Sequence, residues 1–250
     1  MSSTHQGLLL PADTPVHRLA PQCKVAATAL FVFAVACTPT GAYSPYLWYL
    51  LLLTVVAALS RLPPLIMARR LLVEVPFVLF VLALPVLGGP PQLTLLGVTL
   101  SVPGLHAAAT IALKATFGLL ATGVLAATTS PPEIITGLER LRVPRVFTAV
   151  AAFMVRYLEV LAAELARMRT AAACRGGNPR WLWQVRDVTA GFGALVLRSF
   201  ERGERVYLAM ASRGYTGALP AALNGAAAPR VAWAGALSVP ALAAIGLVLL

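Results

Sequence analysis

Residues 198–215 have the sequence RSFERGERVYLAMASRGY, in which an apolar helical stripe ends at Arg213 and a glycine. Apolar side chains spaced alternately four and three residues apart have the period of an α-helix, and a glycine just after the last turn is a common helix end. An earlier stretch, Phe147–Gly176, follows the same plan and ends at Arg175 and a glycine, and the later stretch is predicted to extend over Leu182–Gly214. The sequence therefore predicts two long amphipathic helices, each with an arginine at its carboxyl end.

Each of the two predicted helices has an apolar stripe, and the stripes alone fit equally well two amphipathic helices that pack on the membrane surface. In both stripes the apolar side chains recur every three or four residues. This spacing is typical of a seam between crossing helices, where Gly203 would permit close approach. On the charged face of the second helix, Glu201 and Arg205 lie four residues apart and are expected to pair. The seam is predicted to comprise Met154, Tyr157, Leu161, Phe200, Gly203, Tyr207 and Met210.

At the end of each helix a small residue precedes the arginine and a glycine follows it. An arginine in this position can cap the carbonyls of its own helix, an effect worth ~0.3 to 1 kcal/mol. Small flanking residues would also let the guanidinium enter a groove on a partner, because nothing bulky blocks the approach. Both explanations fit a single end, and the repetition at two comparable ends favours docking. The predicted docking residues are Cys174, Arg175, Gly176, Ser212, Arg213 and Gly214.

The composition places the chain in a membrane. Hydrophobic residues make up 59% and charged residues only 12% of the 250 residues, which is too apolar for a soluble protein of this length. The formal net charge of +11 would suit nucleic acid only if the basic residues shared a polar surface, whereas here they flank apolar runs. Positive charge on the cytoplasmic side explains them better, so no nucleic-acid partner is predicted. The predicted fold class is an all-α polytopic membrane protein with about five transmembrane helices.

Five apolar runs are predicted to span the lipid bilayer. The first is short and, with Cys37, also resembles a signal-peptide core with a lipoprotein cleavage site, but the polytopic remainder argues against that alternative. The uncharged residues 92–102 are expected to form an outside loop or a small hairpin. The predicted spans are Val25–Ala36, Tyr46–Leu59, Leu71–Leu87, Leu105–Ala127 and Val231–Leu250.

The basic residues determine the predicted orientation. Arg61, Arg69 and Arg70 follow the second span and place that loop in the cytoplasm, so the amino terminus is cytoplasmic and five spans leave the carboxyl terminus outside. Residues 133–213 hold 13 arginines and 7 acids, a charge density that predicts the cytoplasmic face of the cell membrane. The predicted domains are an arm with four spans over residues 1–130, the amphipathic-helix region over residues 131–217, and a linker with the last span over residues 218–250.

Two ionisable residues fall inside predicted spans, where such residues are costly and often functional. Counted along their helices, Glu74 lies ~5 Å from the cytoplasmic surface and Lys114 ~14 Å from the opposite one, which leaves ~12 Å between them across a core of ~30 Å. A direct ion pair is therefore not expected. Glu74 is predicted to extend toward the headgroups, and Lys114 to reach a backbone carbonyl, a hydroxyl such as that of Thr110, or a partner subunit.

Cysteine and histidine residues do not suggest a metal site. Cys23, Cys37 and Cys174 have no CxxC spacing, so neither a disulfide nor a thiolate site is predicted and all three are expected to be small packing residues. There is no GxxxxGK[ST] motif for ATP, and no cofactor, metal or catalytic residue is predicted. The histidines are far apart in sequence and are expected at surfaces or interfaces: His5, His17 and His106.

With these features, the chain resembles the transmembrane T component of energy-coupling factor (ECF) transporters, which are ABC-type importers of micronutrients. The likeness is to the CbiQ-like branch, which serves cobalt and nickel uptake. It rests on residues 198–215, quoted above, and on residues 17–24, HRLAPQCK, which are similar to the amino-terminal motif of that branch. The similarity is strong from Val143 to Gly217 and extends over the remaining chain by hydropathy alone.

The resemblance implies two long cytoplasmic coupling helices that cross and insert one arginine each, Arg175 and Arg213, into two ABC-type ATPase subunits. The crossed helices would transmit ATP-driven motion to a membrane S component, CbiM-like in this branch, with a small accessory membrane subunit as an optional partner. The family usually has Ala-Arg-Gly at both ends, whereas here Cys174 and Ser212 precede the arginines. Both are small, so docking is expected to survive, and the end at Gly176-Gly177 is the weaker match.

Two other functions are weighed against this one. An ordinary ABC permease that binds its own substrate fits the spans, but it predicts one coupling helix per subunit rather than two arginine-ended helices in one chain. A membrane-embedded enzyme needs clustered acids for a metal, paired Asp residues, an HExxH motif or a Ser/His set, and the sequence contains none of these. The chain is therefore predicted not to be an enzyme, with ATP hydrolysis taking place in partner subunits.

Overall fold

The computed structural model describes residues 14, 16–83, 85, 92–95, 98–176, 185–215 and 228–249. The chain divides into two compact units, of which the first comprises Met1–Leu141 and Ala226–Leu250 and the second Arg142–Gly225. The sequence predicts boundaries after residues 130 and 217, so the two divisions differ mainly in the short helix after residue 130, which belongs to the first unit.

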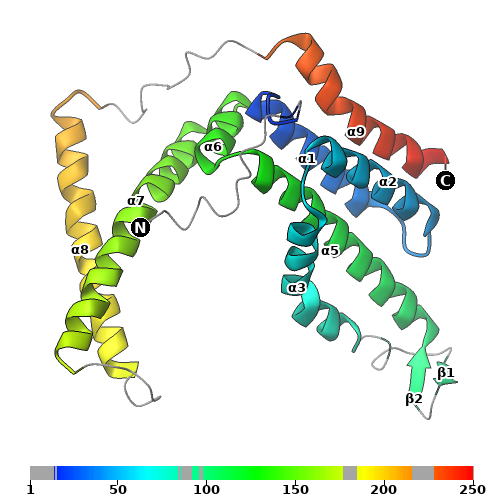
Figure 1. Cartoon of the computed structure of the whole chain (residues 1–250), viewed down its shortest axis with the longest axis horizontal. Helices are drawn as coiled ribbons and strands as arrows, with labels where there is room; N and C mark the ends of the chain where they lie inside the picture. The colour runs from blue at the N-terminus through cyan, green and yellow to red at the C-terminus, as the bar shows by residue number, and fades with distance from the viewer. Residues whose placement is uncertain are drawn as a thin grey trace. The chain divides into compact units, whose positions relative to one another are not determined.

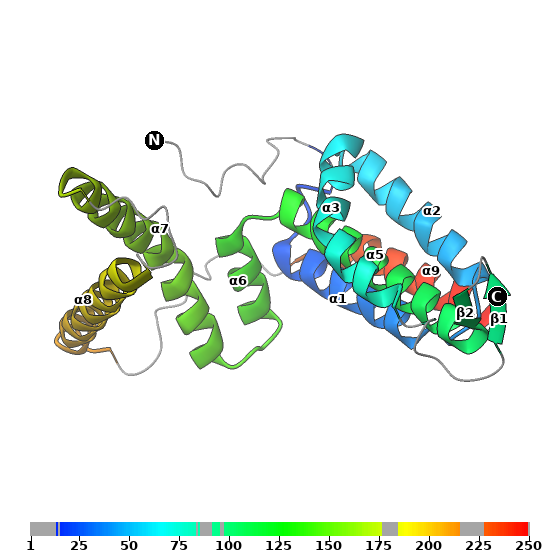
Figure 2. The same ribbon diagram turned by 90° about the horizontal axis from the view of Figure 1, so that it is seen from below.

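The first unit is a bundle of helices. Its helices are α1 Pro21–Cys37, α2 Ser44–Leu59, α3 Pro64–Val81, α5 Val102–Thr128, α6 Pro131–Arg140 and α9 Arg230–Leu249. All but α9 have a proline in the first two positions, where the fixed φ of proline suits a helix start and no backbone N–H needs a partner. Figures 1 and 2 show α1, α2, α5 and α9 side by side, with α3 along α5.

Helix α3 begins earlier than the predicted third span. The sequence predicts a loop through Arg69 and Arg70 and a span over Leu71–Leu87, but the helix begins at Pro64 and ends at Val81. Proline is a favourable first residue for a helix, so helical structure starts directly after the Pro-Pro pair. The two arginines therefore lie in the second turn of α3 rather than in a loop.

An aromatic cluster forms the centre of the bundle. Tyr49 is fully buried and packs edge-on against Phe31 and Phe117, with ring centroids 5.8 and 6.1 Å apart. Tyr46 stacks on Phe117 at 5.8 Å, and the Thr38 hydroxyl lies 3.2 Å from the Tyr49 phenol oxygen. Edge-on and stacked aromatic pairs add specific attraction to the burial of their area. The cluster therefore joins α1, α2 and α5.

The last helix, α9, packs against α1 and α2. Trp48 of α2 donates a hydrogen bond from its indole N–H to the Leu242 carbonyl at 2.9 Å. Gly246 approaches the same indole so closely that an added Cβ would be 2.4 Å from Trp48 Cδ1. Although α9 is distant in sequence from α1 and α2, it is a structural part of the bundle.

The outer sides of α2 and α3 are apolar and exposed. On α3, Val73 and Phe80 are 74% and 75% exposed, and on α2 Leu47 is 74% exposed. Large apolar side chains on the outside of a helical bundle are stable where lipid, rather than water, surrounds them. This arrangement agrees with a membrane-embedded unit.

Three described helices are long and apolar enough to cross a membrane: α5, α9 and α7, which covers Arg145–Cys174 in the second unit. Helices α1 and α2 and part of α3 are also apolar but shorter. The sequence predicts a cytoplasmic position for the whole charged region. Charged residues are unevenly distributed along α7, however, because residues 146–163 contain only two of them, Arg156 and Glu159. Length and composition alone therefore do not distinguish α7 from the spans.

Between α3 and α5 the chain forms an antiparallel hairpin of β1, Gln92–Leu95, and β2, Val98–Ser101. Its register places Gln92 opposite Ser101 and Leu95 opposite Val98. A hairpin is one of the two structures predicted for residues 92–102, and this prediction is confirmed. Apart from this hairpin, the regular structure of the described residues is helical, which confirms the all-α fold class.

The two ionisable residues in the predicted spans have partners inside the first unit. Lys114 donates a hydrogen bond to the Ala36 carbonyl at 2.8 Å, which confirms one of its predicted partner types. Glu74 is 8% exposed and accepts a hydrogen bond from the Thr116 hydroxyl at 3.0 Å. The prediction that Glu74 extends toward the headgroups is wrong, because its side of α3 packs against α5.

The cysteines differ in their surroundings. Cys23 is buried, whereas Cys37 and Cys174 are exposed. The prediction of a packing role is therefore confirmed for Cys23 and wrong for the other two, which lie at helix carboxyl ends where few neighbours cover them.

Two of the histidines make hydrogen bonds in the first unit. His17 Nδ1 lies 2.6 Å from Thr14 Oγ1, and His106 Nδ1 lies 2.6 Å from the Tyr43 hydroxyl, which joins the first turns of α5 to the start of α2. His5 lies outside the described residues. In the part of the chain that the structure describes, no three or more His, Cys, Asp or Glu side chains gather as a metal site would require.

Candidate functional site

The second unit contains two long helices, α7 and α8, the latter covering Val185–Ala211. They run in opposite senses and cross, as Figures 1 and 2 show. Both helices coincide with the stretches for which the sequence predicts amphipathic helices. The candidate site consists of this crossing and of the two helix ends that carry the arginines.

A carboxylate joins the two helices. Glu164 of α7 accepts a hydrogen bond from Arg198 of α8 at 2.7 Å and another from Arg167, one turn further along α7. The hydrogen bond from Arg167, and next that from Arg198, hold the pKa of Glu164 below its ordinary value of 4.5. Glu164 lies beyond the apolar part of α7 and is ionised at neutral pH. Because both arginines are well exposed, the stabilisation from each pair is small, and of the two pairs only that with Arg198 links α7 to α8.

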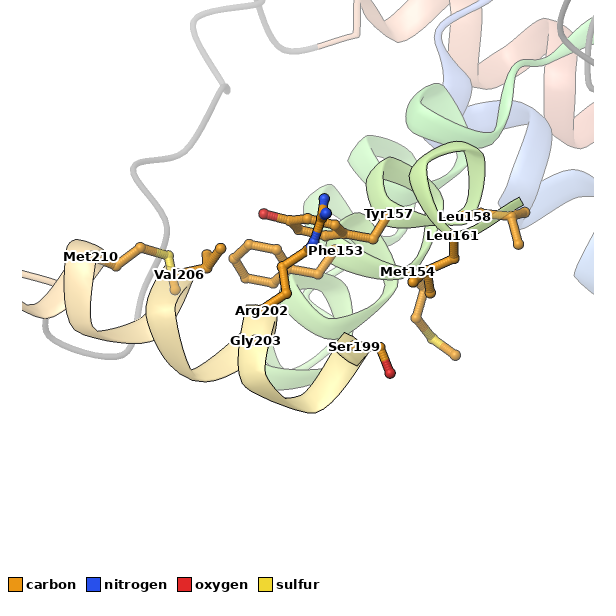
Figure 3. Close-up of a pocket in the computed structure, with 10 residues that line it drawn as sticks. All are labelled: Phe153, Met154, Tyr157, Leu158, Leu161, Ser199, Arg202, Gly203, Val206 and Met210. Atoms are coloured by element: carbon orange, nitrogen blue, oxygen red, sulfur yellow. The ribbon is translucent and has the colours of Figure 1, made fainter. Parts of the chain in front are cut away.

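An apolar groove with a volume of about 500 Å³ lies between α7 and α8. Figure 3 shows side chains from both helices around it, with Arg202 extending toward the rings of Phe153 and Tyr157. An apolar groove of this kind is suited to receive apolar side chains of a partner. The groove is lined by Phe153, Met154, Tyr157, Leu158, Leu161, Ser199, Arg202, Gly203, Val206 and Met210.

The structure brings together most, but not all, of the predicted seam residues. Phe200 and Tyr207 are 71% and 58% exposed and are not part of the groove lining, which includes their neighbours Ser199 and Val206 instead. One residue along a helix corresponds to a rotation of ~100°, so part of α8 faces α7 with a different side from the predicted one. The predicted seam residues that line the groove are Met154, Tyr157, Leu161, Gly203 and Met210.

Two details of the predicted packing are wrong. A Cβ at Gly203 would meet no atom within 4 Å, so close helix approach does not occur there. Glu201 and Arg205 do not pair, and within the described residues the link between the helices is made by Arg198 and Glu164 instead. Sequence analysis missed this link because its two residues are 34 positions apart. The sequence signal that could have indicated this pair is that Glu164 and Arg198 have opposite charges and lie on two helices that are expected to cross.

The two arginines occupy the same backbone position at their helix ends. Arg175 precedes Gly176, which has φ +82°, and Arg213 precedes Gly214, which has φ +84°. Each glycine donates its backbone N–H to the carbonyl three residues before it, at 3.1 Å after α7 and 3.0 Å after α8. The two ends therefore share one local geometry.

Helix termination explains the glycines. A φ near +80° is strained for residues that have a Cβ, and a Cβ at Gly176 or Gly214 would meet no atom within 4 Å, so the backbone angle alone favours glycine. After α8, the Tyr215 N–H also bonds the Met210 carbonyl at 3.0 Å, which completes a Schellman motif. The glycines are thus required by the helix ends whether or not a partner docks there.

Both guanidinium groups are accessible to a partner. Arg175 and Arg213 are exposed, as are Cys174 and Ser212 before them. Among the described residues neither arginine side chain has an ion-pair partner or bonds a carbonyl of its own helix. The capping explanation for these arginines therefore has no support in the structure. What the arrangement can do chemically is bind acidic groups or carbonyls at two points.

The two arginines lie toward opposite ends of the helix pair. Counted from the Glu164–Arg198 contact, Arg175 is eleven residues further along α7 and Arg213 is fifteen residues further along α8. At 1.5 Å per residue in opposite directions, they are separated by at most about 40 Å. Because α7 and α8 run in opposite senses from this contact, the two cations lie on opposite sides of the crossing (Figure 1).

These features define a class: a multi-pass helical membrane protein whose charged region contains two crossed helices, an apolar groove and two exposed arginines at helix ends. Comparison with known proteins gives the family. Residues 12–223 match the model of the CbiQ family, described as cobalt transport protein. The chain belongs to this family, the transmembrane T components of ECF transporters. Members of this family are membrane components of transporters and not enzymes.

Relatives named energy-coupling factor transporter transmembrane protein EcfT match over most of the chain. The protein from Thermanaerovibrio acidaminovorans is 31% identical over 230 residues, which cover 84% of this chain and 82% of the relative. The protein from Heliobacterium modesticaldum is 28% identical over 224 residues, 84% of each chain. The cobalt transport protein CbiQ of Rhodobacter capsulatus is 32% identical over 124 residues, 48% of this chain and 50% of that protein. The resemblance stated from the sequence is confirmed.

Proposed function

We propose that this chain is the coupling subunit of a metal-importing ECF transporter, which transmits the ATP-driven motion of two ABC-type ATPases to a membrane S component. The observation that carries the proposal is the pair of exposed arginines, Arg175 and Arg213, at matching helix ends of one crossed pair. Membership of the CbiQ family supports it. On this proposal ATP is hydrolysed in the ATPase subunits.

Each arginine is proposed to dock into a groove on one ATPase. The planar guanidinium offers several donors in a fixed fork, which suits carboxylates and the carbonyls at a helix end of a partner. Cys174 and Ser212 are small and exposed, so they leave room for close approach. The position of the two arginines on opposite sides of the crossing (Figure 1) supports attachment to two subunits rather than to one.

The docking proposal predicts that charge reversal at both arginines releases the ATPases. Arg175→Glu combined with Arg213→Glu should lower the amount of ATPase that co-purifies by about tenfold or more, because attraction is replaced by repulsion at both contacts. The measurement is the ratio of ATPase to membrane subunit after affinity purification in detergent. Of the two single variants, Arg213→Glu should release more ATPase than Arg175→Glu, since the residues around Arg213 match the family pattern more closely.

A matched control separates docking from general charge effects. Arg169→Glu combined with Arg205→Glu makes the same charge change on the same two helices, at exposed arginines away from the ends. This variant should retain the ATPases. If the docking variant inserts in the membrane and still retains them at the parent level, the docking proposal is wrong.

The S component is proposed to bind the apolar side of the crossed helices. The groove between α7 and α8 has a volume of about 500 Å³; Met154 in its lining is 68% exposed, and Phe200, next to the lining residue Ser199, is 71% exposed. Apolar surface of this extent favours a partner whose own surface is apolar, as that of a membrane protein is. A small accessory membrane subunit would be a further partner in the bilayer.

The proposed cargo is cobalt or nickel. The family description and the name of the Rhodobacter relative refer to cobalt transport, whereas the EcfT names refer to no substrate. The cargo would be bound by a CbiM-like S component rather than by this chain. Uptake of radioactive Co²⁺ and Ni²⁺ by cells that express the complete transporter tests the assignment, and uptake of neither ion would contradict it.

The proposed orientation places the amino terminus and the crossed helices on the cytoplasmic side of the cell membrane and the carboxyl terminus outside. The supporting observation is the uneven distribution of arginine, with 13 in residues 133–213. The ATPases must reach the docking arginines from the cytoplasm, where ATP is present. Both arguments agree on the side of the membrane.

A further inference from the structure

Three parts of the first unit meet at a buried lysine. Lys24, in the first turn of α1, is only 8% exposed. Its ammonium group donates hydrogen bonds to the carbonyls of His17 and Thr128, both at 3.0 Å. A lysine is rarely buried unless its charge is satisfied, so these two carbonyls are needed to hold it there.

The Thr128 carbonyl is a favourable partner because Thr128 is the last residue of α5. The final carbonyls of a helix have no partner in their own helix and carry partial negative charge. The ammonium of Lys24 therefore caps α5 from a different helix, with a charge-assisted hydrogen bond. This bond joins residues 104 positions apart and holds the end of α5 on the start of α1.

The next helix, α6, packs against the same part of α1. A Cβ at Gly137 would lie 3.0 Å from the carbonyl carbon of Pro21, so the two backbones are almost in contact. At the start of α6, Glu133 accepts a hydrogen bond from the Ser130 N–H at 2.8 Å, and the same carboxylate attracts Lys24. The turn between α5 and α6 is thus held on α1 by Lys24, and α6 itself by the contact at Gly137.

We infer that Lys24 is a positioning residue for energy coupling, which locks the turn between α5 and α6 to α1. The inference rests on the proposed function. Only residues 141–144 separate α6 from α7, and the two compact units divide after Leu141. A force on α7 is therefore passed along the chain to α6, which belongs to the first unit. A loose turn would absorb this force, whereas a locked turn transmits it to α1 and α5.

Lys24→Met tests this role in the complete transporter, reconstituted into vesicles with its ATPases and S component. Methionine fills similar space but leaves the Thr128 carbonyl without its ammonium partner. We expect normal assembly, a rate of ATP hydrolysis within about twofold of the parent, and a fall of about fivefold or more in Co²⁺ or Ni²⁺ transported per ATP hydrolysed. Lys24→Arg keeps the charge and should recover most of this ratio.

The number of ions transported per ATP hydrolysed distinguishes a positioning role of Lys24 from a role in stability alone. A purely structural lysine would lower the amount of assembled complex but not the transport achieved per ATP, so an unchanged ratio in assembled Lys24→Met complexes overturns the inference. If Lys24→Met does not fold, Gly137→Ala replaces it, because the added Cβ pushes α6 away from α1. Gly118→Ala is its control, since a Cβ there meets no atom within 4 Å. An unchanged ratio in Gly137→Ala then overturns the inference.

Different results would contradict the proposed coupling function itself. If the parent complex contains no ATPases, or if the variant with both docking arginines reversed transports as well as the parent, the coupling role itself is wrong and the inference about Lys24 is wrong with it. If the parent transports and the docking variant does not, while Lys24→Met keeps the parent ratio, only the inference about Lys24 is overturned.

Discussion

Glu164 connects α7 to α8, and Arg167 and Arg198 favour its charged form. Because these hydrogen bonds lower its pKa in the folded protein below the ordinary value of 4.5, the stabilisation is fully present above that value and is lost as the pH falls through the folded-state pKa. We expect the parent to have a higher melting temperature than Glu164→Gln at about pH 7 and to lose this advantage at about pH 3. Thermal unfolding of both purified proteins at the two pH values measures the effect.

Glu201→Gln is the matched control for this experiment. Glu201 is an exposed acid on α8 that forms no ion pair among the described residues. Its replacement should change the melting temperature little at either pH. A difference between the parent and Glu164→Gln that stays the same from neutral to acidic pH would show that the charge of Glu164 does not stabilise the crossing.

Individual contacts are predictable from the sequence where they depend on local geometry. The depth of Lys114 excludes an ion pair with Glu74 and leaves a carbonyl, a hydroxyl or a partner subunit as its acceptor, and the structure shows the first of these. The partner of Glu74 does not follow from depth, because it depends on which side of α3 faces α5. Lys24 and Glu164 bond residues 104 and 34 positions away, and periodicity contains no information about such pairs.

Among the elements, the ends of α7 and α8 are predictable and their mutual orientation is not. A glycine after an amphipathic stretch marks each end, and both glycines adopt the expected positive φ. The side of α8 that faces α7 depends on the crossing angle, which spacing alone does not determine. For this reason Phe200 and Tyr207 lie outside the groove although they belong to the same apolar stripe as Met210.

The contact between α2 and α9 gives a prediction for Gly246→Ala. The added Cβ would lie 2.4 Å from the Trp48 ring, which is itself held by its hydrogen bond to the Leu242 carbonyl. Overpacking of this kind usually costs ~1 to 3 kcal/mol. We expect a lower melting temperature in detergent and greater exposure of the indole, measured by tryptophan fluorescence.

Gly235→Ala provides the control within the same helix. A Cβ at Gly235 meets no atom within 4 Å, and alanine is a better helix former than glycine by ~1 kcal/mol. This variant should be as stable as the parent or slightly more stable. Equal stability of the parent and Gly246→Ala would mean that α9 does not pack closely against Trp48.

For the molecule as a whole, the native cysteines allow a test of the orientation proposed in the membrane. Cys37 is exposed at the end of α1 and Cys174 is exposed at the end of α7. With the amino terminus in the cytoplasm, a membrane-impermeant maleimide should label Cys37 in intact cells, and Cys174 only after permeabilisation. The measurement uses Cys174→Ser and Cys37→Ser, each of which leaves one exposed thiol.

The buried Cys23 serves as an internal control, because it should remain unlabelled in the folded protein. Thr40→Cys, in the exposed turn between α1 and α2, confirms the result for the outer side if Cys37 reacts slowly. Labelling of Cys174 in intact cells would contradict the proposed orientation and, with it, the access of cytoplasmic ATPases to Arg175.

The sequence predicts which residues form helices better than it predicts which helices pack against each other. The apolar runs predict the helices of the bundle, and the hairpin is among the predicted structures. The return of α9 onto α1 and α2 is not predicted, since it depends on close contacts between distant residues, such as that of Gly246 with Trp48 of α2. The apolar part of α7 shows a further limit, because its length and composition do not distinguish this helix from a membrane span.

The crossing of α7 and α8 also has a mechanical consequence, because it lies off centre. From the Glu164–Arg198 contact, eleven residues lead to Arg175 and fifteen to Arg213, which gives lever arms of about 16 and 22 Å. If the pair turns as a rigid body about this fulcrum, the tip of α8 sweeps an arc about a third longer than the tip of α7. If each arginine docks on one ATPase as proposed, equal movements of the two ATPases would turn the helix pair by different amounts, even when the two ATPases are identical.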